Sequence, residues 1–501
     1  MRPALRARIG SNVAVGTLLG VLTALLFAPA FAGAGSEFDE GILVAFPTRV
    51  LQGDLPYRDF ETFYGPAEPF VAAAVFRVFG STLGAERAIG FAFRLLAVLA
   101  AFALLLPWGR TASFAGGIVA ACVAAAGGVT FGSDIAAQAL AIAAVALAWR
   151  AGRGSPWLLA AAGFVAGLAG LFRAELAVVT VLALVPILLA RRRRSLVLGA
   201  VGFVVVLSPY VPLALAAGTS RLERNFHDLV ATGSARRLPI TAHGDPGHLL
   251  AGFAVALVVL ALAAAASLRH GEPRAPLFCS ITLFAGLQLP YALWRADAPH
   301  VATAGLLAFA ALPAAASELV PRRAVAGAWL AGAAALALFA GVHYVRGGIS
   351  RNAKLALGRT HASVVSYDGR DFRLDDAAAA RSLQRAIDAT ARLAPRGGSL
   401  FVGPTDLRRT DGNDVFVYYL FPHLRPASFF VELDPPASKR SSGLARDLGR
   451  ADVLLLGRRW NRETEPNGSR RFGSNAPNLV VRRLFCRRAG FGGYEVLTRC
   501  R

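Results

Sequence analysis

Residues 156–190 read PWLLAAAGFVAGLAGLFRAELAVVTVLALVPILLA, and the next four residues, 191–194, are all arginine. The stretch is apolar except for Arg173 and Glu175 near its middle. It therefore holds two apolar runs, 156–172 and 174–190, each close to the length that an α-helix needs to cross the hydrocarbon core of a bilayer. Charges confined to the two ends and the middle are typical of a pair of membrane-spanning helices.

Apolar runs of this kind recur along the first two thirds of the chain. The sequence is 55% hydrophobic and only 17% charged, which is more apolar surface than globular cores can cover. We therefore expect an all-α membrane part with about eleven transmembrane helices. The expected spans are 10–32, 87–107, 113–131, 134–149, 156–172, 174–190, 195–217, 247–268, 275–294, 299–318 and 324–345.

Arginines mark every second connection between these runs. They are Arg110, Arg150 with Arg153, the run 191–194, Arg269 with Arg274, and Arg322 with Arg323. By the positive-inside rule, these connections and the N-terminus face the cytoplasm. The other connections and everything after residue 345 then lie outside. The Ala- and Arg-rich composition fits a bacterial plasma membrane.

Two segments on the outer side are long enough to fold. We expect a transmembrane domain at 1–345 with a catalytic outer loop at 33–86, followed by an extracytoplasmic α/β domain at 346–501. In the loop, Phe70–Phe79 is apolar but too short to span, which suits a helix lying in the membrane interface. The tail carries 28 basic and 15 acidic residues, and long domains translocate largely regardless of charge.

The tail alternates between helical and strand patterns, which predicts a small α/β sheet domain. Helices are expected at 375–393, 442–448 and 479–485, and strands at 399–402, 428–433, 452–456 and 494–498. Cys486 and Cys500 close a short loop near the C-terminus and could form a disulfide outside the cytoplasm.

The charge balance indicates the class of partner. The formal net charge is +22, and all basic residues except Lys354 and Lys439 are arginine, which favours phosphate groups and anionic lipid headgroups. Nucleic acid is disfavoured because the charge is spread along a hydrophobic chain. The sequence has no Gly-rich nucleotide-binding loop, which disfavours a nucleotide-driven pump.

Groups able to do chemistry gather in the outer loop and at the outer ends of helices. Asp39 and Glu40 follow the first span directly, where partial burial would raise a carboxyl pKa toward that of a useful base. An ordinary solvated acidic turn is the alternative. The candidate site residues are Asp39, Glu40, Tyr57, Arg58, Asp59, Arg173, Glu175, Arg295, Asp297 and His300.

Two of these pairs allow a local prediction. Arg173 and Glu175 are two residues apart and would not face one another on a helix, so a simple ion pair between them is not expected. Asp297 and His300 are three apart and can share a helix face, either as a hydrogen-bonded pair or as part of a metal site. No cofactor is predicted, and a divalent cation is left open.

Several of these segments resemble the C-class polytopic glycosyltransferases, which include the protein O-mannosyltransferases and the lipid A aminoarabinose transferases. The similar segments are Asp39-Glu40-Gly41, Gly53-x-x-Pro56-Tyr57-x-Asp59, Gly170-Leu171-Phe172-Arg173-Ala174-Glu175 and Leu289-Pro290-Tyr291-x-x-Trp294-Arg295-x-Asp297-x-x-His300. The resemblance covers the membrane portion, and the tail matches no one branch clearly.

The resemblance implies an inverting transfer of a hexose or pentose from a polyprenyl-phosphate sugar to a glycan, lipid or protein acceptor outside the cytoplasm. It assigns the role of base to Asp39, with Glu40 positioning the acceptor or assisting. Arg173 and Arg295, with Arg58 as a third candidate, would hold the phosphate of the leaving group, although helix-end arginines also simply reach for the interface.

Two other functions fit the same frame. A transporter or flippase of lipid-linked glycans would place charges near the bilayer midplane and break its helices there. A non-catalytic envelope assembly protein would use the tail as its working part. The observed charges at outer helix ends favour the enzyme.

Overall fold

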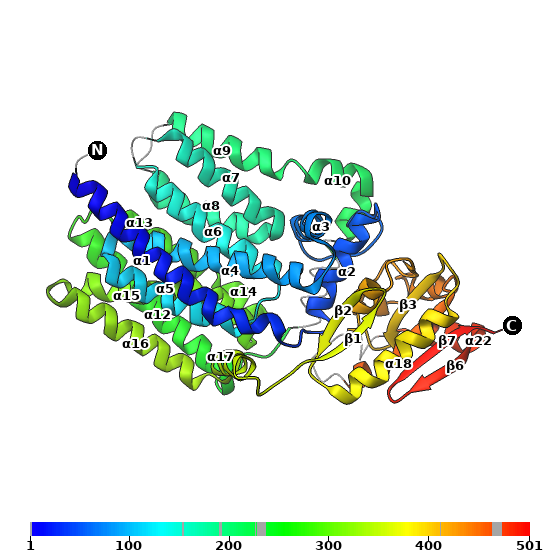
Figure 1. The fold of residues 1–501 in the computed structure, drawn as a ribbon. Helices are drawn as coiled ribbons and strands as arrows, with labels where there is room; N and C mark the ends of the chain where they lie inside the picture. Colours follow the sequence, from blue (N-terminus) through cyan, green and yellow to red (C-terminus); the bar gives the residue numbers. More distant parts are fainter. Residues whose placement is uncertain are drawn as a thin grey trace. The chain divides into compact units, whose positions relative to one another are not determined.

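The computed structural model describes residues 3–152, 155–189, 193–225, 227, 237–410, 412–462 and 473–500. The chain divides into two compact units (Figure 1). The first consists of Met1–Phe31, Ala88–Ser208 and Leu238–Arg359, and the second of Ala32–Arg87, Pro209–Arg237 and Thr360–Arg501. The outer loop at 33–86 thus folds in one unit with the tail. Of the arginines that mark the connections, Arg153, Arg191 and Arg192 lie outside the described residues.

Helices build the first unit. They are α1 (Pro3–Phe27), α4 (Leu83–Leu105, whose first turn counts with the second unit), α5 (Arg110–Ala126), α6 (Ser133–Arg150), α7 (Pro156–Phe172), α8 (Ala174–Leu188), α9 (Arg193–Leu207), α12 (Gly244–Arg269), α13 (Ala275–Leu287), α14 (Leu289–Trp294), α15 (Ala298–Leu319), α16 (Ala324–Gly341) and α17 (His343–Ala356).

The described residues contain eight helical segments that are long and apolar enough to cross a membrane. They are Gly10–Ala32, Leu83–Trp108, Ser133–Arg150, Leu196–Ala217, Gly244–Arg269, Ala275–Trp294, Ala298–Leu319 and Pro321–Gly341. The shorter apolar helices α5, α7 and α8 correspond to the remaining three predicted spans. The protein is therefore a polytopic membrane protein with about eleven spans, which confirms the predicted fold class.

Small residues let the helices of this unit approach closely. A Cβ atom on Gly163 of α7 would lie 1.9 Å from the carbonyl oxygen of Gly199 on α9, and one on Gly116 of α5 would lie 2.3 Å from that of Ala310 on α15. Only glycine fits at such contacts, as is common between membrane helices. Of the most apolar residues of α15, 78% are buried inside the protein, whereas the corresponding share for Gly10–Ala32 is 17%. Helix α15 is therefore central, and much of the first span is left to face lipid.

Three connections predicted to be cytoplasmic meet at one end of the unit. Glu318, at the end of α15, accepts a hydrogen bond from Trp108 Nε1 at 2.9 Å and pairs with Arg274 Nε at 2.9 Å. Arg274 also donates to the carbonyl of Pro107 at 3.2 Å. Strict alternation of the spans places these three connections on the same side of the membrane. Which side of the membrane this end faces stays a prediction.

A mixed five-stranded sheet organises the second unit. Its strands run in the order β4 (Arg425–Pro426), β3 (Ser399–Pro404), β5 (Val453–Gly457), β7 (Tyr494–Arg499) and β6 (Phe485–Phe491). Strand β3 is parallel to β4 and β5, whereas β7 is antiparallel to β5 and β6. In this register Leu400 pairs with Val453, and Leu454 with Leu497. Strands β1 (Ser363–Tyr367) and β2 (Arg370–Leu374) form a separate antiparallel hairpin.

Helices cover both faces of the five-stranded sheet. Leu400 and Val402 share one hydrophobic core with α18 (Ala377–Leu393), α19 (Phe416–Leu420) and the loop helices α2 (Asp39–Leu51) and α3 (Ala67–Phe79). The intervening Phe401 faces a second core formed with α20 (Leu444–Leu448) and α22 (Ala476–Leu484). The alternation of strand side chains thus predicts two cores, and the outer loop contributes to one of them. Helix α10 (Tyr210–Ala217) completes the unit.

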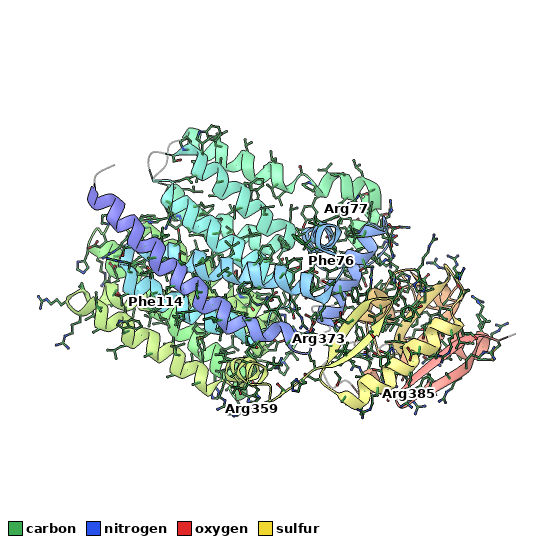
Figure 2. All side chains as sticks on the ribbon, in the orientation of Figure 1. Phe76, Arg77, Phe114, Arg359, Arg373 and Arg385 are labelled. Atoms are coloured by element: carbon green, nitrogen blue, oxygen red, sulfur yellow. A yellow bond between two sulfur atoms is a disulfide. The ribbon has the colours of Figure 1, made fainter. Side chains whose placement is uncertain are left out.

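The interfacial helix predicted at Phe70–Phe79 corresponds to α3. Its Phe76 is buried, while Arg77, Val78 and Phe79 are exposed. Figure 2 labels Phe76 and Arg77 on this helix. An exposed surface that mixes apolar groups with one arginine is what a helix in the membrane interface needs. Its position at a membrane stays a prediction.

The strand predicted at 428–433 is wrong. This segment is irregular and ends at Leu433 with φ of 57°, in the left-handed region. It is apolar because it is buried. The Asn413 side chain donates a hydrogen bond to the Val431 carbonyl of this segment at 3.0 Å and another to the Val402 carbonyl of β3 at 2.8 Å. The β1–β2 hairpin, β4, β6 and helix α19 were not predicted. The helices and the other three strands of the tail are confirmed.

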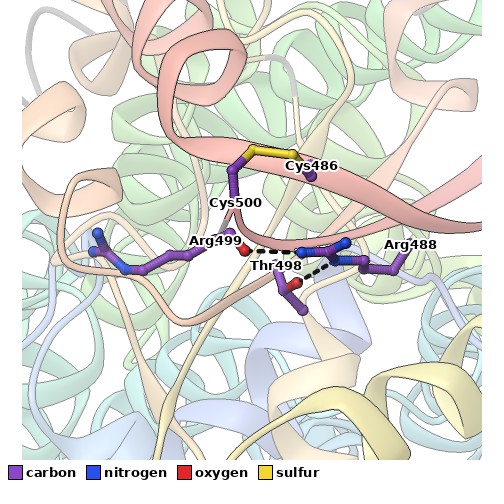
Figure 3. The surroundings of a disulfide bond; sticks show 5 residues. All are labelled: Cys486, Arg488, Thr498, Arg499 and Cys500. Atoms are coloured by element: carbon purple, nitrogen blue, oxygen red, sulfur yellow. Dashed lines mark hydrogen bonds between the residues drawn. A yellow bond between two sulfur atoms is a disulfide. The ribbon is translucent and has the colours of Figure 1, made fainter.

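A disulfide joins Cys486 in β6 to Cys500, directly after β7 (Figure 3). Arg488 reinforces the same strand pair: its Nε donates to Thr498 Oγ1 at 2.8 Å and its Nη2 to the Arg499 carbonyl at 3.1 Å. The pairing that the sequence left open is thus present in the structure.

Candidate functional site

The segment from Gly33 to Gly41, which carries the Asp39–Glu40 pair, is held in place by a buried ion pair. Arg87 donates through Nε to Glu40 Oε1 at 2.8 Å and through Nη2 to Glu40 Oε2 at 2.9 Å. A third bond runs from Arg87 Nη1 to the Gly33 carbonyl at 2.9 Å. Both side chains are almost fully buried, with 2% and 0% exposure. Both carboxylate oxygens of Glu40 thus accept hydrogen bonds from Arg87.

Two glycines allow this segment to pass through a narrow space. A Cβ atom on Gly35 would lie 1.5 Å from Glu40 Oε2, and one on Gly41 would lie 2.8 Å from the backbone nitrogen of Phe416. The Gly35 N–H also donates to the Arg373 carbonyl at 3.0 Å. The segment is therefore fitted against β2 and α19 of its own unit.

Asp39 differs from its neighbours because it is exposed. It opens α2, where its backbone N–H donates to Ser36 Oγ at 3.0 Å while the Ser36 hydroxyl donates to Asp39 Oδ2 at 2.9 Å. The partial burial expected of this carboxyl is not found in the structure.

Glu37 reaches a second cluster, which the sequence did not reveal. Arg459 donates through Nη1 to Glu37 Oε1 at 2.8 Å, and its Nη2 lies 3.1 Å from Asp414 Oδ1. Trp460 Nε1 donates to the other oxygen of Asp414 at 3.2 Å. Burial raises the pKa of Asp414, although the charge of Arg459 opposes that shift. Burial alone would lower the pKa of Arg459, but Asp414 and Glu37 raise it above its ordinary value.

The second part of the loop forms a tight turn. Arg58 donates to Asp59 Oδ2 through Nη2 at 2.7 Å, and the Leu55 N–H donates to the same oxygen at 2.8 Å. Burial would raise the pKa of Asp59, but these hydrogen bonds and the charges of Arg58 and Arg49 bring it below its ordinary value. Tyr57 is buried at φ of 66°, and its hydroxyl donates to the Tyr64 carbonyl at 2.8 Å.

The first unit carries a polar cluster of its own, around Tyr291. The Arg173 guanidinium lies 4.8 Å from the centre of the Tyr291 ring. The centres of the Tyr291 and His300 rings are 5.4 Å apart. Cation–π contact of this kind holds a guanidinium in a fixed orientation. The structure thus brings Arg173 and His300 to one aromatic ring.

The prediction that Arg173 and Glu175 form no ion pair is wrong. Arg173 Nε donates to Glu175 Oε1 at 2.5 Å. Arg173 is the N-cap of α8, with extended backbone at φ −146° and ψ 110°, and only Glu175 lies within the helix. The spacing rule for helix faces does not apply because one partner is outside the helix.

Asp297 is the centre of the other predicted pair. As N-cap of α15, it accepts hydrogen bonds at Oδ1 from the His300 N–H at 2.9 Å and from His300 Nδ1 at 2.6 Å. Its Oδ2 accepts from Arg295 Nε at 2.9 Å. Burial would raise the pKa of Asp297, but His300 and Arg295 bring it below its ordinary value. Of the two interpretations, the hydrogen-bonded pair is present.

Within each unit the structure therefore joins residues that the sequence had picked separately. In the first unit these are Arg173, Glu175, Arg295, Asp297 and His300. In the second unit Tyr57, Arg58 and Asp59 form one turn. Asp39 and Glu40 have different environments, since Asp39 is exposed and Glu40 is buried against Arg87. Sequence analysis missed Arg87, Asp414 and Arg459. Arg87 had a signal, since it is a charged residue at the first position of a predicted span. Across the described ranges, no three His, Cys, Asp or Glu side chains are grouped so that they could hold a metal ion.

No protein-family model matches the sequence, and no curated protein matches it either. Solved structures do. The crystal structure of ArnT from Cupriavidus metallidurans bound to undecaprenyl phosphate is 14% identical, with a TM-score of 0.53 over 98% of each chain. The apo ArnT structure is also 14% identical, with a TM-score of 0.52 over 99% of this chain and 98% of ArnT. ArnT is a lipid A aminoarabinose transferase, so the likeness confirms at the level of the fold the predicted resemblance to C-class polytopic glycosyltransferases.

Proposed function

We propose that this protein is an inverting glycosyltransferase that moves a hexose or pentose from a polyprenyl-phosphate carrier to an extracytoplasmic acceptor. The observation that carries the proposal is the state of the carboxylates at the start of α2. Glu37 and Glu40 are engaged by Arg459 and Arg87, which leaves Asp39 as the exposed carboxylate between them. The fold shared with ArnT, which binds undecaprenyl phosphate, supports a donor of the same lipid class.

In this mechanism Asp39 takes the proton of an acceptor hydroxyl. The hydroxyl oxygen forms a bond to the anomeric carbon while the bond from that carbon to the phosphate oxygen breaks, and the electron pair leaves with the polyprenyl phosphate. Transfer of the proton to a positioned carboxylate contributes typically about 10²–10⁴-fold to the rate. The fixed interaction of Ser36 with one Asp39 oxygen leaves the other for the acceptor.

Arginines would stabilise the negative charge of the departing phosphate. Arg173 is oriented by Tyr291 and Glu175, and Arg295 by Asp297 with His300 behind it. Arg58 is fixed by Asp59 beside the buried Tyr57, in the same unit as Asp39. A planar guanidinium in a fixed orientation matches the oxygens of a phosphate through paired N–H donors. Glu40 acts through Arg87, which holds the segment that carries Asp39.

We further infer that the chain lies in a bacterial plasma membrane with the N-terminus in the cytoplasm and 346–501 outside. The Cys486–Cys500 disulfide supports an oxidising compartment for the tail. The arginines at every second connection support the same orientation. The acceptor is a glycan, lipid or protein of the cell envelope.

The test is a transfer assay with the purified protein in lipid nanodiscs. A panel of synthetic polyprenyl-phosphate sugars, labelled in the sugar, is incubated with envelope extract as the source of acceptor. We expect label to pass from one donor to extract components. Absence of transfer across the whole panel would contradict the proposal, and label that crosses the bilayer of proteoliposomes while still on the lipid would instead support a transporter.

A further inference from the structure

We propose that Arg459, a residue of the C-terminal domain, positions the catalytic carboxylate Asp39 by clamping the residue two places before it, Glu37. The inference rests on the proposed function and deepens it. It also gives the tail a role in the reaction, because Arg459 and Glu37 are 422 residues apart in the chain.

Arg459 joins two carboxylates from different segments. One nitrogen of its guanidinium donates to Glu37 at 2.8 Å, and another lies 3.1 Å from the fully buried Asp414. The same guanidinium lies 4.7 Å from the centre of the Trp460 ring. A planar group with donors on several nitrogens is suited to such a bridge, whereas the ammonium of lysine is a single point charge.

An aromatic contact extends the clamp to the next residue. The rings of Phe38 and Trp460 are 6.2 Å apart, within the range for an edge or tilted aromatic pair. Trp460 is in turn held by its hydrogen bond to Asp414. Residues 37 and 38 are thus both fixed by the pair Arg459–Trp460, and the next residue is Asp39.

The position of Asp39 then depends on two separate attachments. Glu40, directly after Asp39, is fixed by Arg87, and Glu37 before it by Arg459. Without the Arg459 contact, the segment before Asp39 is held only further back, where the Gly35 N–H donates to the Arg373 carbonyl. Without the guanidinium, Glu37 and Asp414 would also lose the positive charge that lies between them, and like charges would then separate the two segments.

Displacements of about 1 Å can lower a rate by about 100-fold without changing how tightly the substrate binds. A positioning residue should therefore affect kcat more than KM. The chain offers a matched control in the adjacent Arg458, which is 60% exposed and pairs with Glu495 instead.

The experiment compares Arg459→Gln, Arg459→Lys and Arg458→Gln with the wild type in nanodiscs. Steady-state transfer gives kcat and the KM for the donor, and hydrogen exchange followed by mass spectrometry reports protection of the 33–41 backbone. For Arg459→Gln we expect kcat to fall about tenfold or more while KM stays within about twofold, together with faster exchange at 33–41. Arg459→Lys should be intermediate and Arg458→Gln unchanged in both measurements.

Unchanged kcat in Arg459→Gln, or an equal loss in Arg458→Gln, would overturn the inference. Unchanged exchange at 33–41 would overturn it too, because the segment would then not depend on the clamp. If the wild type itself transfers no sugar from any donor, the proposed function fails, and the exchange measurement decides separately whether Arg459 holds Glu37.

Discussion

Arg87 binds both carboxylate oxygens of Glu40 from a position 47 residues further along the chain, and both side chains are withdrawn from solvent. The pair joins the start of α2 to the start of α4. The third hydrogen bond of Arg87, to the Gly33 carbonyl, ties the first residue of the 33–86 loop to the residue that follows the loop. The pair therefore fixes the residue that directly follows Asp39.

Removal of the cation should be costly because a buried charge would be left alone. We expect Arg87→Met to lower the free energy of unfolding by about 3–5 kcal/mol, the usual effect of breaking a buried ion pair. The measurement is thermal unfolding of the purified protein, with Arg77→Met as control, since Arg77 is exposed on α3. Equal melting temperatures for the two variants would show that the Glu40–Arg87 pair contributes nothing.

Close packing at Gly41 predicts a cost for a single methyl group. In Gly41→Ala the new Cβ would lie 2.8 Å from the Phe416 nitrogen, so we expect a loss of about 1–3 kcal/mol from overpacking. Gly286→Ala is the matched helical control, because no atom lies within 4 Å of its Cβ position. That variant should be neutral or gain up to about 1 kcal/mol from helix propensity. A Gly41→Ala protein as stable as Gly286→Ala would contradict the packing.

Glu432 predicts a pH dependence of stability. Its pKa is raised, first by burial and then by the hydrogen-bonded Asp434, with Glu61 and Glu68 adding to the effect. A raised folded-state pKa means that this stability is complete below the ordinary glutamate pKa and is lost as pH rises toward the folded value. The loss reaches about 1.4 kcal/mol per pH unit.

Glu432→Gln should remove that loss, because an amide does not ionise. We expect its melting temperature to exceed that of the wild type more at about pH 8 than at about pH 5. The exposed Glu223→Gln serves as control and should follow the wild type at both values. A parallel pH dependence in wild type and Glu432→Gln would exclude this carboxyl as its source.

The disulfide can be counted chemically. The chain has four cysteines, of which Cys122 and Cys279 are free. Protein denatured without reductant should therefore take up two maleimide groups, and four after reduction, as read from its mass. Four additions without reductant would show that Cys486 and Cys500 are not paired in the membrane of origin.

The membrane helices were predictable because each apolar run had to satisfy its own backbone hydrogen bonds in lipid, whatever its neighbours. The strands β3, β5 and β7 were predictable for a related reason, since their apolar side chains fill two cores. The β1–β2 hairpin was missed because polar residues interrupt its apolar ones, as Arg370, Asp371 and Arg373 illustrate. The apolar residues at 428–433 suggested a strand, but they are apolar because the segment is buried. A hydrogen bond from the Asn413 side chain, and not a neighbouring strand, pairs with its backbone at Val431.

The candidate site was predictable where the chemistry is local in sequence. Asp297 and His300 are joined by a helix cap, which their spacing allows. Arg459 and Asp414 had no such signal, because Arg459 joins Asp414 to Glu37 at the other end of the chain and only the fold brings the three together. Arg173 misled for a local reason, as its backbone is extended where the pattern suggested a helix.

The central claim is that Asp39 is the base of a sugar transfer from a lipid phosphate. The most direct measurement is the initial rate at which polyprenyl phosphate is released from the labelled donor by wild type, Asp39→Asn and the control Asp375→Asn, an exposed aspartate before α18. The account predicts a loss of about 100-fold or more for Asp39→Asn alone. Release by Asp39→Asn within about twofold of the wild type would contradict the account.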